Sequence, residues 1–392
     1  MTNKALVAGV GMIPFTKPGK SQSYDVMGAQ AARFALQDAG IAYEDVGQAY
    51  VGYVFGDSTC GQSALYEVGL TGVPVVNVNN NCSTGSTALY LARQAVESGV
   101  VDVALALGFE QMNPGALTVA NADRPPILGR FWKAVGQLQQ PDPNAPFAAQ
   151  WFGGAGREHQ EKYGTKQETF ARISQKARKH AANNPLAVFR DPLTLEEVMQ
   201  SQHLYGPLTR YQACPPTCGA AAAVIVSPAY AKRKGLQGLV KIAGQALATD
   251  KPASFGSMLQ LVGSEMTKTA AAQAYAHAGI GPKDVQVVEL HDCFSVAEAV
   301  FSEALGLCPE GGAEKMVLDG DNTYGGKYVI NPSGGLLSKG HPLGATGLAQ
   351  CYELVHQLRG TAEKRQVEGV KNALQHNAGL GGAAVVTIYS AA

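Results

Sequence analysis

The 392-residue sequence has no excess of charge of either sign, because 31 Lys and Arg residues balance 31 Asp and Glu residues. Nucleic acid and anionic membrane surfaces, which attract basic proteins, are therefore poor candidates for its main ligand. No apolar run approaches the roughly 20 residues of a membrane-spanning helix. Residues 1–15 also lack the long apolar core of a signal peptide. We therefore expect a cytoplasmic protein with no nucleic acid partner and no stable membrane insertion.

The seven cysteines lack the compact spacing of a disulfide framework. Their number is odd, and the chain is much longer than the small secreted domains that disulfides stabilise, so free thiols are expected. Cys214 and Cys218 are spaced like one half of a zinc site, but no second pair or nearby histidine completes it. The sequence therefore predicts no metal site.

The arrangement of apolar segments is typical of an α/β protein. Hydrophobic residues make up 46% and charged residues 16% of a chain that is too long for one ordinary core. Apolar segments alternate with helical patterns, and the first of them cover residues 5–15, 48–56, 73–81 and 101–109. Strands that alternate with helices predict a parallel sheet covered on both faces.

Two short patterns recur in the second part of the chain, in the same order. Ala-Gly-Ile followed by Asp-Val occurs at residues 39–46 and again at 278–285. The segment CSTGSTAL at residues 82–89 matches HPLGATGL at 341–348 in its Gly, Thr and Leu positions. Two matches in the same order indicate a duplicated α/β half.

A region rich in Pro, Gly and aromatic residues separates the two repeats. We interpret residues 116–209 as an inserted loop domain. The N-terminal half then comprises residues 1–115 with 210–236, and the C-terminal half comprises residues 237–392.

In this duplication Cys82 corresponds to His341, and each lies where a turn enters a helix. The unpaired N–H groups and partial positive charge of a helix N-terminus favour a thiolate and can hold an oxyanion, so we expect a lowered Cys82 pKa. If the two helix starts face each other, a thiol meets an imidazole, which is an activated nucleophile with its base. The alternative is a buried, inert cysteine, a common fate of this residue. The polar segment at residues 79–81 and the partner histidine favour the reactive thiol.

Four segments in this order resemble the thiolase superfamily: NNNCSTGSTAL (79–89), HDCFS (291–295), NPSGGLLSKGHPLGATG (331–347) and HNAGLGGAAVVT (376–387). Within it they are most similar to the thiolases fused to, or associated with, sterol carrier proteins.

The resemblance implies duplicated halves layered α-β-α-β-α and an acyltransferase of lipid metabolism. Its reaction would be the thiolytic cleavage of a 3-oxoacyl-CoA, or the reverse condensation, through an acyl-cysteine. The products would be acetyl- or propionyl-CoA and a shortened acyl-CoA. Coenzyme A would be a co-substrate, no cofactor would be permanently bound, and the assembly would be a homodimer or homotetramer. Apolar strands such as residues 73–81 could continue a sheet across its twofold axis.

The resemblance also implies roles for individual residues. Cys82 resembles the nucleophile, His341 its base, and Cys293 the second thiol, which carries a proton to and from carbon. His291 is implied to hold the enolate oxygen together with His341. For the tetrahedral intermediate we expect the N–H groups of Cys82 and Gly379.

Two residues carry weaker expectations. His376 lies next to the loop that contains Gly379, and it could be structural or face the substrate. Relatives usually carry Asp at the position of Cys218, so we expect a changed local hydrogen bond there.

Two other functions remain open at this stage. One is a thiolase-fold retro-aldolase, or an acyltransferase on a different substrate. The other is a non-catalytic lipid-binding or scaffold protein, which would need no unusually reactive cysteine.

Overall fold

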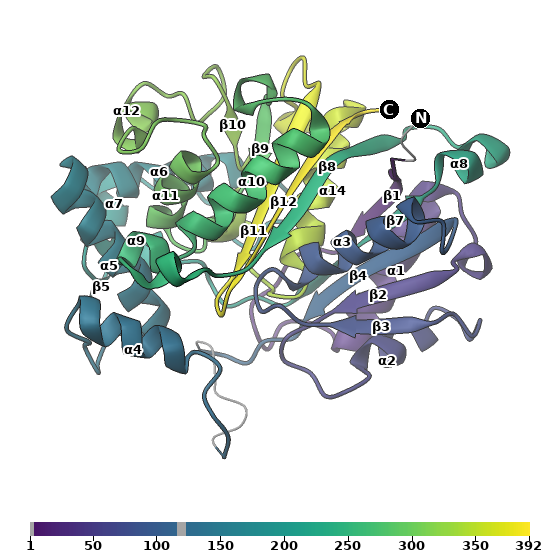
Figure 1. Cartoon of the computed structure of the whole chain (residues 1–392), viewed down its shortest axis with the longest axis horizontal. Coiled ribbons are helices and arrows are strands. Elements are labelled where there is room, and N and C mark those ends of the chain that lie inside the picture. The colour runs from purple at the N-terminus through teal and green to yellow at the C-terminus, as the bar shows by residue number, and fades with distance from the viewer. Residues whose placement is uncertain (1–3, 116–122) are drawn as a thin grey trace.

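The computed structural model describes residues 4–115 and 123–392 and contains one ten-stranded sheet, in the order β10-β9-β11-β12-β8-β1-β7-β4-β2-β3 (Figure 1). The first five positions belong to the C-terminal half and the last five to the N-terminal half. Within the described ranges, no helix is both long and apolar enough to cross a membrane.

Within the described residues, the N-terminal half contributes five strands and four α-helices. The strands are β1 (Leu6–Met12), β2 (Gln48–Gly52), β3 (Val75–Val78), β4 (Val103–Glu110) and β7 (Gly219–Val226). The helices are α1 (Tyr24–Ala39), α2 (Cys60–Tyr66), α3 (Thr84–Glu97) and α8 (Pro228–Lys234).

The C-terminal half repeats this plan. Its strands are β8 (Val240–Ala248), β9 (Val287–Glu289), β10 (Val329–Ile330), β11 (Asn372–Gly379) and β12 (Ala383–Ala391). Its helices are α9 (Met258–Leu261), α10 (Ser264–Ala278), α11 (Ser295–Ala304), α12 (Ala313–Leu318), α13 (Gly335–Ser338) and α14 (Thr346–Arg359). The order β10-β9-β11-β12-β8 matches β3-β2-β4-β7-β1 strand for strand, which confirms the predicted duplication.

The sheet is mixed, so the prediction of a parallel sheet holds only for part of each half. In the N-terminal half β2 is parallel to β3 and β4, whereas β7 runs antiparallel to both β4 and β1. In the C-terminal half β9 is likewise parallel to β10 and β11, whereas β12 runs antiparallel to β11 and β8. The equivalent strand β12 follows β11 through a turn of three residues, which is too short for the crossover that parallel neighbours need.

The halves stack as the predicted layers α-β-α-β-α. Helix α1 packs on one face of the N-terminal strands, and α10 packs on the outer face of the C-terminal strands. Helices α3 and α14 share one core between the two sets of strands. Their close contact depends on glycine, because a Cβ on Gly85 of α3 would lie 2.6 Å from the carbonyl oxygen of Gly344, just before α14. This contact brings the starts of α3 and α14 together.

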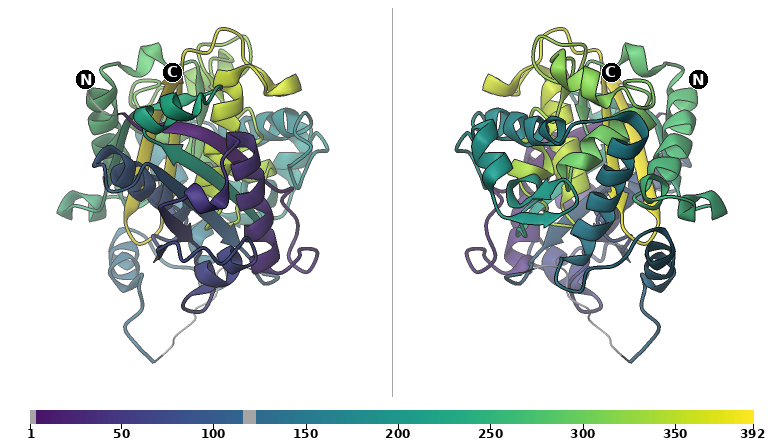
Figure 2. Two further views of the ribbon diagram at one scale, coloured as in Figure 1. Left: turned by 90° about the vertical axis from the view of Figure 1, so that its right-hand side faces the viewer. Right: turned by 90° about the vertical axis from the view of Figure 1, so that its left-hand side faces the viewer.

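The connection between β4 and β7 covers one end of this layered body. It contains α4 (Gly129–Leu138), α5 (Phe147–Tyr163), α6 (Gln167–Ala181), α7 (Leu195–Gln200), β5 (His203–Tyr205) and β6 (Leu208–Thr209). These elements lie beside α9 and α11, on the side away from β3, and the β11–β12 turn points toward α4 (Figures 1 and 2). Residues 116–122 of the expected inserted domain lie outside the described ranges, and the three domain boundaries stay a prediction.

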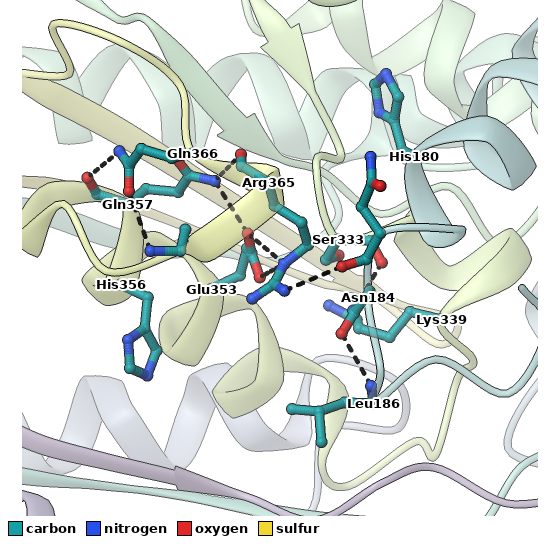
Figure 3. Close-up of polar contacts among 12 residues, drawn as sticks. His180, Asn184, Leu186, Ser333, Lys339, Glu353, His356, Gln357, Arg365 and Gln366 are labelled. Carbon is teal, nitrogen blue, oxygen red and sulfur yellow. Dashed lines mark hydrogen bonds and ion pairs between the residues drawn. The ribbon is translucent and has the colours of Figure 1, made fainter.

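Buried polar contacts fasten this connection to the C-terminal half (Figure 3). The side-chain amide of Asn184 donates to the Ser333 carbonyl at 2.9 Å. Arg365 pairs with the Glu353 carboxylate at 2.9 Å and also donates to the backbone carbonyl of Asn183 at 3.4 Å. The first of these contacts holds the segment that contains Ser333, and the second holds the segment after α14.

Candidate active site

A cavity of about 240 Å³ opens where the two halves meet the β4–β7 connection. Five of the six residues predicted from the sequence line it, namely Cys82, His291, Cys293, His341 and Gly379. The sixth, His376, is buried outside its wall. The duplicated helix starts therefore converge on one site.

Cys82 is presented by a strained turn between β3 and α3. Asn81 has a left-handed backbone (φ 51°), which Asn tolerates better than most residues. Its side-chain amide donates to the Leu380 carbonyl at 3.0 Å, which ties the turn to the β11–β12 hairpin. The Asn81 side chain thus stabilises the turn that carries the Cys82 thiol.

Burial raises the pKa of Cys82 to about 12, so the prediction of a lowered pKa was wrong. The backbone N–H groups of Leu380 and of Cys82 itself act in the expected, lowering direction. They are outweighed by desolvation in an apolar cavity, to which the nearby Glu110 carboxyl adds. Cys82 is consequently a thiol near neutral pH and needs a base to react.

His341 has the protonation pattern of such a base. The Thr346 hydroxyl donates its single hydrogen to the Pro342 carbonyl at 2.9 Å. It must then accept from Nδ1–H of His341, 2.7 Å away, which leaves a lone pair on Nε2. Among the described residues this buried Nε2 has no partner. Burial and the neighbouring His291 hold the His341 pKa well below its usual range, so the ring is neutral.

His291 has the opposite pattern. The side-chain amide of Asn377 donates to its Nδ1 at 3.0 Å, so Nε2 carries the hydrogen. Burial lowers the pKa of His291 to about 3. The two rings lie edge to face with centroids 5.0 Å apart. The site therefore holds one imidazole that accepts and one that donates.

The same pattern bears on metal binding. Cys82, His291 and His341 offer ligand atoms within 4.8 Å of one another, a spacing that a soft ion such as Zn²⁺ could use. Because Nε2 of His291 bears a hydrogen, the cluster offers two ready ligands rather than three. The arrangement fits proton transfer better than metal coordination.

Cys293 follows β9 and lies directly before α11. Burial, together with the nearby Cys214 and Cys82, raises its pKa well above the usual range. Its carbonyl accepts the N–H of Cys214 at 2.8 Å, and Cys214 also lines the cavity. Three thiols thus share one site. Sequence reasoning considered Cys214 only as half of a metal pair, because its contact with Cys293 is long-range.

The β11–β12 hairpin contributes backbone rather than a side chain. A Cβ on Gly379 would lie 2.2 Å from the Asn80 carbonyl oxygen and 3.1 Å from the Ser83 nitrogen, so only glycine fits against the Cys82 turn. The backbone N–H of the next residue, Leu380, acts to lower the pKa of Cys82. The oxyanion donor expected at Gly379 stays a prediction.

His376 acts behind the cavity rather than within it. Its Nδ1 faces the backbone N–H of His291 at 3.5 Å, and its Nε2 contacts the Thr267 hydroxyl at 2.9 Å. Of the two roles left open by the sequence, this geometry favours the structural one.

Cys218 also lies outside the cavity. Its thiol donates to the Met112 carbonyl at 3.4 Å. Cys214 lines the cavity and Cys218 does not, so the pair that resembled half of a zinc site is not presented to a common ligand. The adjacent Thr217 accepts the N–H of His341 at 2.5 Å.

Glu110 is a buried acid that sequence reasoning missed. It ends β4 and accepts the backbone N–H groups of Val54, Phe55 and Gly344 at 2.9–3.1 Å. Burial raises its pKa to about 7. The one available signal was a single acid at the end of the apolar segment VALALGFE.

The remaining wall of the cavity is apolar. Its main side chains come from the β4–β7 connection, α9, α10 and the start of α11: Phe131, Phe152, Leu204, Leu261, Met266 and Phe294. Such a wall favours a hydrophobic acyl group and excludes water from the thiols.

Comparison with known proteins agrees with this fold. The family described as thiolase, N-terminal domain matches residues 5–229, and thiolase C-terminal domain-like matches residues 248–391. The chain therefore belongs to the thiolase superfamily. More particularly, it is of the sterol-carrier type. It is 53% identical over 393 residues to sterol carrier protein 2 of Homo sapiens, across 98% of this chain and 72% of that protein.

With other relatives the match extends over nearly the whole length of both proteins. Non-specific lipid-transfer protein-like 2 of Caenorhabditis elegans is 46% identical, over 98% of this chain and 96% of its own. Benzoylsuccinyl-CoA thiolase subunit BbsB of Thauera aromatica is 36% identical, over 97% and 96%. The solved Ltp2–ChsH2(DUF35) aldolase has a TM-score of 0.84 at 26% identity, over 99% of this chain and 98% of its own. Human mitochondrial 3-ketoacyl-CoA thiolase in complex with CoA has a TM-score of 0.74 at 20% identity, over 100% and 99%, which shows the shared fold.

Proposed function

We propose that this protein is a thiolase that cleaves a 3-oxoacyl-CoA between C2 and C3, or runs the reverse condensation. Coenzyme A is its co-substrate and no cofactor is permanently bound. The observation that carries the proposal is the pairing of a buried Cys82 thiol with the unpartnered Nε2 lone pair of His341. Relatives named as a thiolase and as a CoA complex support the choice of substrate class.

In the first step, His341 Nε2 takes the proton of the Cys82 thiol, and the sulfur attacks the C3 carbonyl carbon. Negative charge develops on the C3 oxygen. We expect the backbone N–H groups of Cys82 and of the hairpin at Gly379 and Leu380 to donate to it, as in an oxyanion hole. The lowering effect of the Cys82 and Leu380 backbone on the Cys82 pKa supports this expectation. Neutralising the thiolate by bond formation also removes the desolvation penalty that keeps Cys82 protonated.

In the second step, the C2–C3 bond breaks and its electrons move into an enolate on the departing thioester. The Nε2–H of His291 and the newly protonated His341 donate to the enolate oxygen. Cys293 gives its proton to C2, which releases acetyl-CoA, or propionyl-CoA from a 2-methyl substrate. The acyl group remains on Cys82.

In the third step, the Cys293 thiolate takes the proton of the incoming CoA thiol. The CoA sulfur attacks the acyl-Cys82 carbonyl, and His341 returns its proton to the departing Cys82 sulfur. The shortened acyl-CoA leaves with every proton restored to its starting residue. Each of these steps is reversible, so the same residues can also catalyse the condensation.

A retro-aldolase is the second candidate, and the aldolase with a TM-score of 0.84 favours it. Aldol cleavage releases a ketone or aldehyde and needs no acyl-enzyme. The buried thiol facing a base instead suits acyl transfer. A non-catalytic lipid-binding role would leave this pairing without a purpose.

We propose further that the protein forms a homodimer or homotetramer. Strand β3 ends the described sheet, with Val76 38% exposed at its edge and Tyr66 and Leu70 exposed nearby. A second copy could pair with this edge. A monomer in light scattering at micromolar concentration would contradict the proposal.

The proposed reaction is tested by incubating the enzyme with a panel of 3-oxoacyl-CoA and acyl-CoA substrates. We expect CoA-dependent formation of acetyl- or propionyl-CoA, and mass spectrometry should find the acyl adduct on the Cys82 peptide. An adduct confined to another cysteine, or release of an aldehyde or ketone without an adduct, would contradict the thiolase assignment.

A further inference from the structure

We propose that Gln375, Ser86 and Asn377 are positioning residues, which form a buried hydrogen-bond chain that keeps the hydrogen of His291 on Nε2. The chain starts at the Gly347 carbonyl and ends at Nδ1 of His291. Its kinetic consequence rests on the proposed function, because that consequence concerns the donor to the enolate oxygen. Its structural consequence, the tautomer of His291, does not depend on which reaction is catalysed.

The direction of the chain is set at Gln375. The side-chain nitrogen of Gln375 lies 2.6 Å from the carbonyl oxygen of Gly347, which can only accept. The other end of the same amide, Oε1, accepts the hydroxyl of Tyr389. The Gly347 carbonyl therefore fixes the orientation of the amide. Its second N–H is directed to the Ser86 hydroxyl at 2.7 Å, which is nearer than the Gln350 side-chain oxygen at 3.4 Å.

The orientation of the Gln375 amide determines the donors and acceptors in the next two hydrogen bonds. Because Ser86 Oγ accepts from Gln375, its own hydrogen goes to Asn377 Oδ1 at 2.9 Å. Asn377 then presents its nitrogen to His291 Nδ1 at 3.0 Å. An Nδ1 that accepts leaves the ring hydrogen on Nε2. Ser86, Gln375 and Asn377 all have 0% exposure, so water does not compete for these bonds.

A second, shorter chain sets His341 in the opposite sense. There a single hydroxyl, that of Thr346, stands between the Pro342 carbonyl and Nδ1 of the ring. The chain to His291 ends in a donor, because the Asn377 amide presents its nitrogen to Nδ1 of the ring. The chain to His341 ends in an acceptor, the Thr346 hydroxyl oxygen. Two imidazoles 5.0 Å apart therefore take complementary protonation states.

The chain exists only when the two halves are docked. Ser86 belongs to α3, whereas Gln375 and Asn377 stand two residues apart on β11 and so share one face of that strand. Gly347 lies in the first turn of α14, and a Cβ there would lie 2.2 Å from Ser86 Oγ. Contact between the central helices thus decides which nitrogen of His291 can donate.

The direct test is the tautomer of His291, read from two-bond ¹H–¹⁵N correlations of histidine-labelled protein, with His291→Gln used to assign the signal. We expect Nε2–H in the unaltered protein. In Asn377→Asp the carboxylate can only accept, so the hydrogen should move to Nδ1. Ser86→Ala leaves the Asn377 amide free to turn, and a mixture of tautomers should result.

The kinetic test compares the same variants in thiolysis. Loss of one oxyanion donor typically costs about 10²–10³-fold in kcat. We expect a fall of about 10²-fold in kcat with little change in KM for Asn377→Asp, and a smaller fall for Ser86→Ala.

Gln357→Leu is the matched control, because it removes a buried amide from the far end of α14 that donates to Glu353 and to the Arg365 carbonyl (Figure 3). It should change neither the His291 signal nor kcat. Nδ1–H in the unaltered protein, or an unchanged His291 signal in both chain variants, would overturn the inference. If the unaltered protein cleaves no 3-oxoacyl-CoA, the proposed function fails while the tautomer measurement still decides this inference.

Discussion

Strands β4 and β11 occupy equivalent places in the two halves and are both eight residues long, but they end differently. Strand β4 ends at the buried Glu110, and the chain needs residues 111–218 to return as β7. Strand β11 ends at Gly379 and returns as β12 after three residues. The long connection walls the cavity with apolar side chains, whereas the short one brings the backbone N–H of Leu380 to where it acts to lower the Cys82 pKa. The two halves therefore share the same strand arrangement, but their connections of unequal length contribute different groups to the site.

The starts of α3 and α14 show the same divergence. Cys82 and His341 occupy corresponding places, yet one presents a sulfur and the other a nitrogen lone pair. The largest expected effect comes from breaking this pair. Cys82→Ala should abolish the acyl adduct, because the atom that forms the bond is gone. His341→Ala should still form it, about 10²–10⁴-fold more slowly, because only the base is lost.

Mass spectrometry of enzyme mixed with acyl-CoA measures both effects. Cys351→Ala is the control, since Cys351 is a buried cysteine on α14 that does not line the cavity. It should form the adduct at the normal rate. An adduct that persists in Cys82→Ala would contradict the assigned roles.

The two thiols supplied by the C-terminal half and by the long connection, Cys293 and Cys214, offer the next comparison. They are neighbours in one cavity, but only Cys293 is proposed to carry the proton. Cys293→Ala should reduce exchange of the α-protons of acetyl-CoA with deuterated water by about 10²–10⁴-fold. It should leave acylation of Cys82 by a simple acyl-CoA intact.

Cys214→Ala is the matched variant and should exchange normally. Proton NMR or mass spectrometry of the recovered acetyl-CoA follows the exchange. Normal exchange in Cys293→Ala together with its loss in Cys214→Ala would transfer the proton-carrying role to Cys214.

The buried Glu110 at the end of β4 leads to a prediction about how the free energy of unfolding depends on pH. Burial raises the pKa of Glu110 from 4.5 to about 7, so the folded state holds this proton more tightly than the unfolded state. Its contribution to stability is therefore fully present below pH 4.5 and is lost as the pH rises through 7. Glu110→Gln has no such titration. The free energy of unfolding of the unaltered protein, minus that of Glu110→Gln, should fall by about 3 kcal/mol from acid to alkaline conditions.

Urea unfolding of both proteins at about pH 4 and about pH 8 measures this difference. A difference that stays constant across this range would mean that Glu110 titrates near its ordinary pKa in the folded state. Its three N–H donors would then offset the effect of its burial on the pKa.

The smallest expected effect concerns the apolar wall. Leu204 lies on β5 of the long connection and lines the cavity. Leu204→Phe should narrow the acyl space and lower kcat/KM for long acyl groups. Each methylene that is excluded should cost about 0.8 kcal/mol, or roughly fourfold. Cleavage of the shortest 3-oxoacyl-CoA is the internal control, and an equal loss for short and long substrates would contradict the placement of the acyl group.

Cys82 and His341 could be predicted from the local pattern, because each lies where a turn enters a helix. The roles of His291 and Cys293 came from the resemblance of HDCFS to the thiolase superfamily. Leu380, Cys214 and Glu110 could not be found in this way. An ordinary leucine contributes only its backbone N–H, Cys214 meets Cys293 across a long-range contact, and Glu110 matters because three distant amides surround it.

The sequence by itself determined the alternation of strands and helices, the duplication, and the residue types at the two helix starts, since all of these are local patterns. Only the tertiary structure decided the protonation states. The local field of a helix start favours a thiolate at Cys82, yet burial raises its pKa to about 12, because desolvation depends on everything packed around the sulfur. The ring nitrogens are likewise set by partners up to hundreds of residues away, such as Ser86 and Asn377. Which atom carries a proton is thus a property of the docked halves rather than of any single segment.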